Sequence, residues 1–255
     1  MSSPHDELGA GPAVVLLHAG VADRRMWADL LPSIAAAGYR VVAVDLPGFG
    51  DATDPGSTPH AAVLETMDAL HIERAALIGN SFGGAVALRV AVTAPDRVAA
   101  LVLVSAPAPG VEPSAELEAA WEAEESALER GDVDGAVGAV VDAWTLPDAP
   151  RALRDRIAEM QRRALELQAA AGDLPPADDP LEPDSSALST LNIPALIAVG
   201  ELDMTDFQAG GEALARQLRQ ARLVVIPGAG HLAPLEQPEA FRQLIVEYLN
   251  ETYGH

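Results

Sequence analysis

A serine at the centre of a glycine-flanked pentapeptide is the residue most suited to chemistry. Residues 79–83 read Gly-Asn-Ser-Phe-Gly, directly after the apolar run Ala75–Ile78 and before the helical pattern Phe82–Ala94. A strand that reverses this tightly into a helix forces its central residue into a strained backbone and exposes the side chain. The pattern therefore predicts Ser81 as a nucleophile, with the Phe82 amide at the helix N-terminus facing a developing oxyanion.

A serine hydroxyl needs a base, and His231 is the best placed histidine. It lies in a glycine-rich loop, residues 227–236, that follows the last predicted strand. In an open α/β sheet such a loop faces the same crevice as the turn at Ser81. We expect His18, which precedes the nucleophile, to brace its own loop through ring hydrogen bonds. The remaining histidines lie at the chain ends or beside a helix: His5, His60, His71 and His255.

The acid that orients the base is expected on a loop between the nucleophile and the base. Asp203 follows the strand Ala195–Val199 by four residues and is the first choice. Asp206 is the second candidate and Glu201 the third. Asp142 stands in a helical pattern and is interpreted as a solvated surface charge.

A second oxyanion donor is expected from the loop after the strand Ala13–Leu17. The Gly20 amide is the first choice, with Ala19 and Val21 as alternatives. The side chains of Ala19, Val21 and Trp144 are predicted to contact the substrate.

Short apolar runs alternate with amphipathic helical patterns over most of the chain, which predicts an open, mostly parallel sheet flanked by helices. The predicted strands are Ala13–Leu17, Arg40–Val44, Ala75–Ile78, Ala100–Val104, Ala195–Val199 and Leu223–Ile226. The predicted helices are Trp27–Ala37, Ala61–Leu70, Phe82–Ala94, Ala209–Gln220 and Pro238–Leu249.

The alternation stops between Pro107 and about Leu191, where the sequence is acidic and helical. Helices are predicted at Glu116–Arg130, Val133–Trp144 and Ala149–Ala171, followed by a Pro/Asp-rich linker at 174–180. Because strands flank this stretch on both sides, residues 107–190 are interpreted as a helical cap inserted into a core of residues 1–106 and 191–255. An independent helical bundle is the alternative.

Composition excludes several classes of function. The chain has 255 residues, 16 basic against 38 acidic, a net charge of −22 and no cysteine. The charge repels nucleic-acid phosphates, and the lack of thiols excludes disulfides and thiolate metal sites. We find no motif for a metal or a cofactor. There is no signal-peptide pattern and no apolar run of roughly 18–20 residues, which favours a cytoplasmic protein without membrane contact.

The order of these motifs resembles that of the α/β-hydrolase superfamily, over about residues 13 to 250. The motifs that carry the resemblance are His18-Ala19-Gly20, Asp45-Leu46-Pro47-Gly48-Phe49-Gly50, Gly79-Asn80-Ser81-Phe82-Gly83-Gly84, Gly200-Glu201-Leu202-Asp203 and Gly230-His231. Within the superfamily the chain is similar to the small carboxylesterase and 3-oxoadipate enol-lactonase-like group. The resemblance implies a Ser81–His231–Asp203 triad, oxyanion amides from Gly20 and Phe82, a cap over the site and no cofactor.

Three features depart from the family pattern. Residues 48–52 read Gly-Phe-Gly-Asp-Ala where G-x-G-x-S is usual, and Ala19 replaces a common glycine. Only about a dozen residues precede Ala13, so the usual N-terminal hairpin is predicted to be missing or shortened. The strand Arg40–Val44 would then be an exposed sheet edge, open to edge-to-edge dimerisation or covered by the N-terminal tail. A monomer and a homodimer both remain open.

The predicted substrate is a small-molecule ester or lactone with a small to medium apolar acyl group. Trp121 and Trp144 either line the acyl pocket or, as we expect more, pack inside the cap. Arg24 and Arg25 could meet a substrate carboxylate, as an enol-lactone would require, but are interpreted rather as surface charges. Enol-lactone hydrolysis is the first alternative, followed by carbon–carbon bond hydrolysis, a cofactor-free perhydrolase or haloperoxidase, and a non-catalytic binding module.

Overall fold

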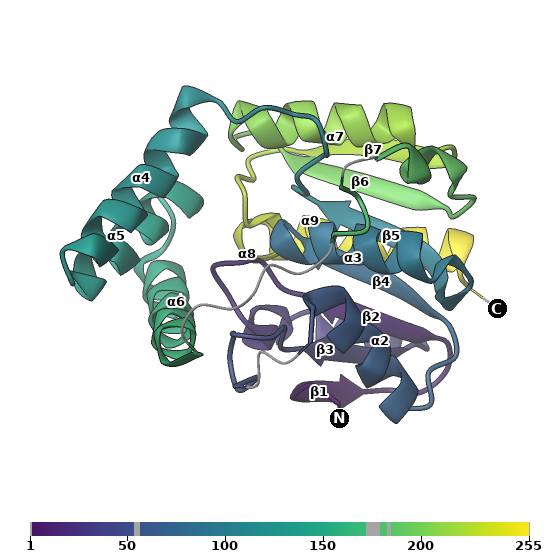
Figure 1. The fold of residues 1–255 in the computed structure, drawn as a ribbon. Helices are drawn as coiled ribbons and strands as arrows, with labels where there is room; N and C mark the ends of the chain where they lie inside the picture. Colours follow the sequence, from purple (N-terminus) through teal and green to yellow (C-terminus); the bar gives the residue numbers. More distant parts are fainter. Residues whose placement is uncertain (1, 54–56, 172–178, 183–184, 255) are drawn as a thin grey trace.

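The sheet is the centre of the computed structural model, which describes residues 2–53, 57–171, 179–182 and 185–254 (Figure 1). Within these residues seven strands form one sheet in the order β1-β3-β2-β4-β5-β6-β7. All neighbours run parallel except β1 and β3. The strands are β1 His5–Leu8, β2 Ala13–Leu17, β3 Arg40–Val44, β4 Ala75–Asn80, β5 Val98–Val104, β6 Ala195–Gly200 and β7 Ala221–Ile226.

Helices cover both faces of the sheet. The α-helices are α1 Leu31–Ala36, α2 Pro59–Ala69, α3 Phe82–Thr93, α4 Ala115–Glu129, α5 Val133–Trp144, α6 Arg151–Ala171, α7 Thr205–Gln217, α8 Ala233–Glu236 and α9 Pro238–Thr252. Short 3-10 helices are η1 Arg24–Trp27, η2 Pro95–Arg97 and η3 Ser185–Thr190.

Buried side chains alternate between two apolar clusters on opposite faces of the sheet. Val14 and Leu16 of β2 pack in one cluster with side chains from α1 and α9. Val15 and Leu17 pack in the other, with side chains from α2, α3 and α7. Since both faces are covered, a central strand must be apolar at every position, which is why these strands read as unbroken apolar runs.

The predicted elements are present, with a few different ends. The strands Ala13–Leu17 and Arg40–Val44 have the predicted bounds, and the four other predicted strands are longer by one or two residues. The predicted helix Trp27–Ala37 is wrong at its start, because η1 ends at Trp27 and α1 begins only at Leu31. The Asp23 carboxylate caps η1 by accepting a hydrogen bond from the Arg25 amide, which favours this short separate turn.

Of the two alternatives for the edge at β3, the structure has the one in which the N-terminal tail covers it. The described part of the tail contains one strand, β1, which pairs antiparallel with β3 from His5 opposite Val44 to Leu8 opposite Val41. The N-terminal hairpin is therefore shortened to a single strand, as one version of the prediction had it. An ion pair of 2.7 Å between Arg40 and Glu7 fixes the pairing at one end.

Helices α4, α5 and α6 follow β5 and precede β6, and Figure 1 shows them together on one side of the sheet. Arg25 of η1 contacts Glu159 of α6 at 2.6 Å, and Asp29 contacts Arg156 at 3.3 Å, so ion pairs join α6 to the sheet domain. Most of the predicted linker at 174–180 lies outside the described residues. Among the described helices none is both long and apolar enough to cross a membrane.

Candidate active site

Ser81 occupies the sharp turn between β4 and α3. Its φ of 51° and ψ of −114° lie in a backbone region that residues other than glycine rarely adopt. The Ser81 amide donates to the carbonyl of Val104 at 2.7 Å, which anchors the turn to β5. A Cβ at Gly79 would overlap the backbone of Gly83, and one at Gly83 would overlap the backbone of Leu17. The two glycines are therefore required by close backbone approach.

His231 and Asp203 lie together at the ends of neighbouring strands. The imidazole Nδ1 is 3.1 Å from Asp203 Oδ1, and both side chains are almost fully buried. The rival acids bind elsewhere. Asp206 accepts from the amide and hydroxyl of Ser114 at 2.6 and 2.7 Å, and Glu201 accepts from the Gly228 amide at 2.9 Å.

The histidine ring is held by contacts that the sequence did not indicate. The rings of Phe207 and Trp144 lie 4.2 and 4.6 Å from it, measured between centroids. The buried Asn80 side chain donates from Nδ2 to the His231 carbonyl at 3.1 Å and to the Val104 carbonyl at 3.2 Å. The residue before the serine thus ties the histidine loop to the end of β5.

The Glu236 carboxylate joins the histidine loop to the inserted helices. It accepts from the Gly230 amide at 2.7 Å and from the Leu146 amide, just after α5, at 3.2 Å. Burial raises the pKa of Glu236, while these two hydrogen bonds act in the opposite direction. The loop that carries His231 and the end of α5 are therefore held at a fixed separation.

The two predicted oxyanion donors lie next to each other. A Cβ added at Gly20 would be 3.5 Å from the Cβ of Phe82. Within the described part of the chain, neither the Gly20 amide nor the Phe82 amide donates to a protein acceptor. The alternative donor, the Ala19 amide, points to the Met26 sulfur at 3.4 Å.

His18 braces the loop that carries Gly20, as expected. Its Nδ1 donates to the Ala19 carbonyl at 2.9 Å, and its Nε2 accepts from the Leu46 amide at 3.0 Å. This pair of bonds requires the neutral ring. Burial lowers the pKa of His18, in agreement with that state.

A cavity of about 400 Å³ connects these parts, within the range of small-molecule sites. Ser81 and His231 line it, whereas Asp203 lies behind the histidine ring. The predicted substrate contacts Ala19, Val21 and Trp144 are in its wall, and so are the predicted oxyanion donors Gly20 and Phe82. Trp121 also lines the cavity, so the expectation that it packs inside the cap is wrong.

Seven further lining residues were not predicted from the sequence: Ala85, Pro107, Leu117, Glu124, Gln161, Gln168 and Phe207. Glu124 stands seven residues after Leu117 and three after Trp121, the spacing of one helix face. That spacing places the three residues on one helix face, but it does not indicate that this face meets the cavity.

Arg24 and Arg25 do not line this cavity. Arg24 is largely buried and forms ion pairs with Asp45, with Asp51 at 2.9 Å and with Asp6 at 3.3 Å. Arg25 pairs with Asp23 at 2.8 Å and with Glu159. Arg24 is therefore a structural charge between loops, and its interpretation as a surface charge is wrong. Asp142, in contrast, is exposed and paired with Arg154, as expected for a surface helix charge.

The part of the chain that the structure describes has no group of three or more His, Asp or Glu side chains arranged to hold a metal ion.

Comparisons with known proteins identify the fold family. A family model described as "alpha/beta hydrolase fold" matches residues 12–238. The chain is 30% identical to the pimeloyl-(acyl-carrier protein) methyl ester esterase of Aeromonas hydrophila, over 98% of this chain and all of that protein.

Two further similarities differ in extent. The chain is 39% identical to the 2-hydroxy-6-oxo-6-phenylhexa-2,4-dienoate hydrolase of Comamonas testosteroni, over 39% of this chain and 38% of that protein. The solved structure of a thermophilic esterase from Thermogutta terrifontis matches with a TM-score of 0.80 and 28% identity, covering 98% of this chain and 93% of the other.

Proposed function

The chain belongs to the α/β-hydrolase fold family, and on that basis we propose that it is a serine hydrolase that cleaves small-molecule carboxylic esters through an acyl-enzyme. One observation carries the proposal. The strained Ser81 and the imidazole of His231 line the same cavity, and the far side of that imidazole is hydrogen-bonded to Asp203 at 3.1 Å. This is the arrangement in which a weak hydroxyl nucleophile is activated by an oriented base.

The reaction has two steps. His231 takes the Ser81 proton as the hydroxyl attacks the ester carbonyl, and then protonates the leaving alcohol. Water, activated by the same imidazole, then releases the acid. Asp203 fixes the imidazole tautomer and stabilises the imidazolium. The adjacent amides of Gly20 and Phe82 hold the oxyanion, a contribution of roughly 3–4 kcal/mol per donor to the barrier.

Residues 107–190 serve as the cap of the site. All three helices of this segment contribute to the cavity wall, with Trp121 from α4, Trp144 from α5 and Gln161 from α6. A cavity of about 400 Å³ suits a small to medium acyl chain. The lactone alternative that depends on a substrate carboxylate loses support, because Arg24 and Arg25 are paired outside the cavity.

Replacement of the nucleophile is the direct test. We expect Ser81→Ala to lower kcat for p-nitrophenyl butyrate by at least about 10⁴-fold, because the acyl-enzyme cannot form. A fluorophosphonate probe should label the wild type at Ser81 and leave the variant unlabelled. Ser33→Ala, in α1 and outside the cavity, is the matched control and should retain labelling. Full activity of Ser81→Ala, or no labelling of the wild type, would contradict the proposal, and the second result would favour a binding module.

Carbon–carbon bond hydrolysis is the second candidate. It is favoured by the local 39% identity to a dienoate hydrolase. The same serine, base and oxyanion amides would serve that reaction. The two activities are distinguished by incubating the protein with 2-hydroxy-6-oxo-6-phenylhexa-2,4-dienoate and measuring the loss of absorbance of this substrate. A kcat/KM for the dienoate well above that for any p-nitrophenyl ester would reassign the site.

A further inference from the structure

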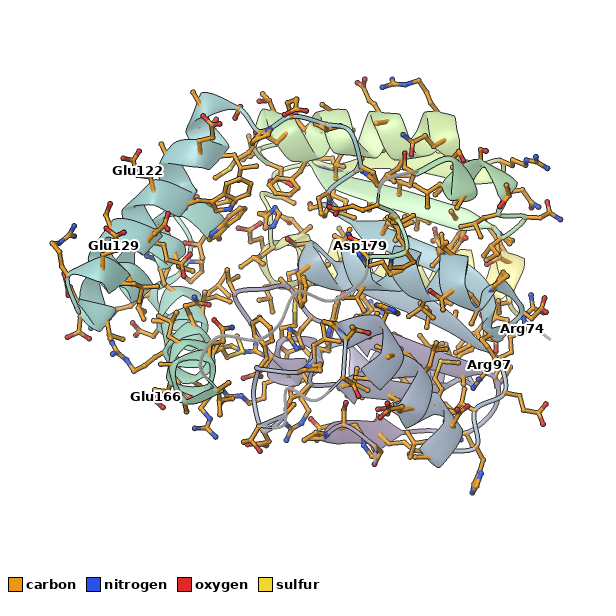
Figure 2. All side chains as sticks on the ribbon, viewed as in Figure 1. Arg74, Arg97, Glu122, Glu129, Glu166 and Asp179 are labelled. Atoms are coloured by element: carbon orange, nitrogen blue, oxygen red, sulfur yellow. The ribbon has the colours of Figure 1, made fainter. Side chains whose placement is uncertain are left out.

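One glutamate of helix α4 differs from its neighbours in where it lies. Glu122, Glu125 and Glu129 are exposed, and Figure 2 shows the labelled Glu122 and Glu129 projecting from the outer side of the inserted helices. Glu124 is partly buried and lines the cavity that contains Ser81 and His231. It shares a helix face with Leu117 and Trp121, which line the same cavity.

No cation neutralises Glu124 in the described part of the chain. Elsewhere most arginines are paired with carboxylates, including five on α6 alone: Arg151, Arg154, Arg156, Arg162 and Arg163. The hydrogen bond that Glu124 accepts comes from the neutral Gln161 amide, Nε2 to Oε1 at 2.9 Å. Burial raises the pKa of Glu124, as expected for a carboxylate withdrawn from water without a counter-ion.

The Gln161 side chain adds an acceptor, its amide oxygen, that receives no hydrogen bond from the described residues. The residue is 5% exposed and lines the same cavity. Since buried polar groups are normally hydrogen-bonded, a donor is lacking at this end of the cavity. The cap side of the cavity therefore presents acceptors and a negative charge, and the complementary ligand group is a donor that carries positive charge.

The aromatic wall next to Glu124 favours the same kind of ligand. Trp121 and Trp144 both line the cavity, and Trp121 is 49% exposed. A cation close to an indole face is attracted by the ring quadrupole, and tryptophan is the most effective ring for this. The net charge of −22 attracts cationic substrates at longer range.

We propose that the cavity takes esters that carry an ammonium group, either a protonated amine or a quaternary ammonium, at the end remote from the reacting carbonyl. Glu124 binds this group against the Trp121 ring, with Gln161 orienting the carboxylate. The proposal rests on the esterase function above and specifies its substrate class. It leaves the reacting centre at Ser81 unchanged and adds a specificity-determining pair on the cap helices.

Binding can be measured without turnover in the Ser81→Ala variant. The probes are choline and 3,3-dimethylbutan-1-ol, which have the same shape and differ in the positive charge. Calorimetry should give choline at least a tenfold lower Kd. In Ser81→Ala/Glu124→Gln the two Kd values should become similar, whereas Ser81→Ala/Glu125→Gln, altered at the exposed neighbour, should keep the difference. Equal Kd values in Ser81→Ala, or a preference that survives Glu124→Gln, would overturn the proposal.

Turnover gives the second readout, with acetylthiocholine and 3,3-dimethylbutyl thioacetate as the matched pair. We expect a ratio of kcat/KM of at least ten in favour of the cation, falling towards one in Glu124→Gln. If Glu124→Gln does not fold, Trp121→Leu, at a half-exposed position, should lower the same ratio. Choline binding without hydrolysis of any ester would contradict the esterase function alone. Hydrolysis of both thioesters at equal kcat/KM would contradict the ammonium site alone.

Discussion

His18 connects a protonation state to the stability of the oxyanion loop. Burial lowers the pKa of the His18 imidazole, so the unfolded chain binds a proton at pH values where the folded chain does not. The stabilisation by His18 is therefore fully present above its unfolded pKa of about 6.5, and is lost as pH falls towards the lowered value. We expect the wild type to lose stability on this account between pH 7.5 and 5.5.

The variant His18→Gln isolates this contribution. At pH 7.5 it should be less stable than the wild type by roughly 1–3 kcal/mol, the usual cost of disturbing a buried hydrogen bond. At pH 5.5 the difference should be smaller, because only the wild type has lost the histidine contribution. Urea unfolding at both pH values measures it. His71→Asn, at an exposed position, is the control and should follow the wild type. A difference that grows at pH 5.5 would refute the argument.

At the scale of single residues, local sequence patterns predict Ser81, His231 and Asp203 as a triad because each follows the end of an apolar strand. Parallel strands bring such positions to one edge of the sheet. Glu124, Gln161 and Phe207 could not be found in this way. They reach the cavity only through the packing of α4, α6 and α7, which depends on long-range contacts that no local pattern encodes.

At the scale of elements, the approach of α3 to β2 depends on Gly83. We expect Gly83→Ala to destabilise the protein by about 3 kcal/mol, because the added methyl group overlaps the Leu17 backbone and the helix must move away. The same movement displaces Ser81, so esterase activity should fall together with the melting temperature. Thermal unfolding and p-nitrophenyl butyrate hydrolysis are the two measurements.

Gly138 offers the matched control for that substitution. It is an exposed residue in the middle of α5, and a Cβ added there would have no neighbouring atom within 4 Å. Gly138→Ala should therefore stabilise the protein by roughly 0.5–1 kcal/mol, since alanine is the better helix former. If both variants lose similar stability, close approach is not the reason for the glycine at 83.

The elements themselves were largely predictable, with errors of physical origin. β4 was predicted to end at Ile78 because Gly79 resembles a turn signal, yet it continues to Asn80 since its pairing with β5 extends that far. The start of α1 was misplaced because the Asp23 cap and the short η1 separate the loop from the helix. The antiparallel β1 was not expected, because His5–Leu8 is short and polar, and only its pairing with β3 makes it a strand.

At the scale of the whole molecule, β1 covers the backbone of β3, which would otherwise be the edge of the sheet. Removal of residues 1–9 would expose the backbone donors and acceptors of the apolar strand β3. We expect the truncated protein to form dimers or larger species. Light scattering at matched concentration should then give it a larger molar mass in solution than the full chain. Removal of residues 1–2 alone leaves β1 in place and should not change the size. An unchanged size after removal of β1 would show that this edge has no role in assembly.

The carboxylate of Glu236 has a consequence for how a substrate reaches the serine. Because it accepts hydrogen bonds from Gly230 on one side and Leu146 on the other, movement of the end of α5 away from the sheet would displace His231, the proposed general base. If the cap opened by a hinge movement of α5, His231 and Ser81 would therefore be separated at each opening. Substrate entry beside the half-exposed indole of Trp121, with the cap helices in place, would not require this movement. Ser81 and His231 would then stay in position from one turnover to the next.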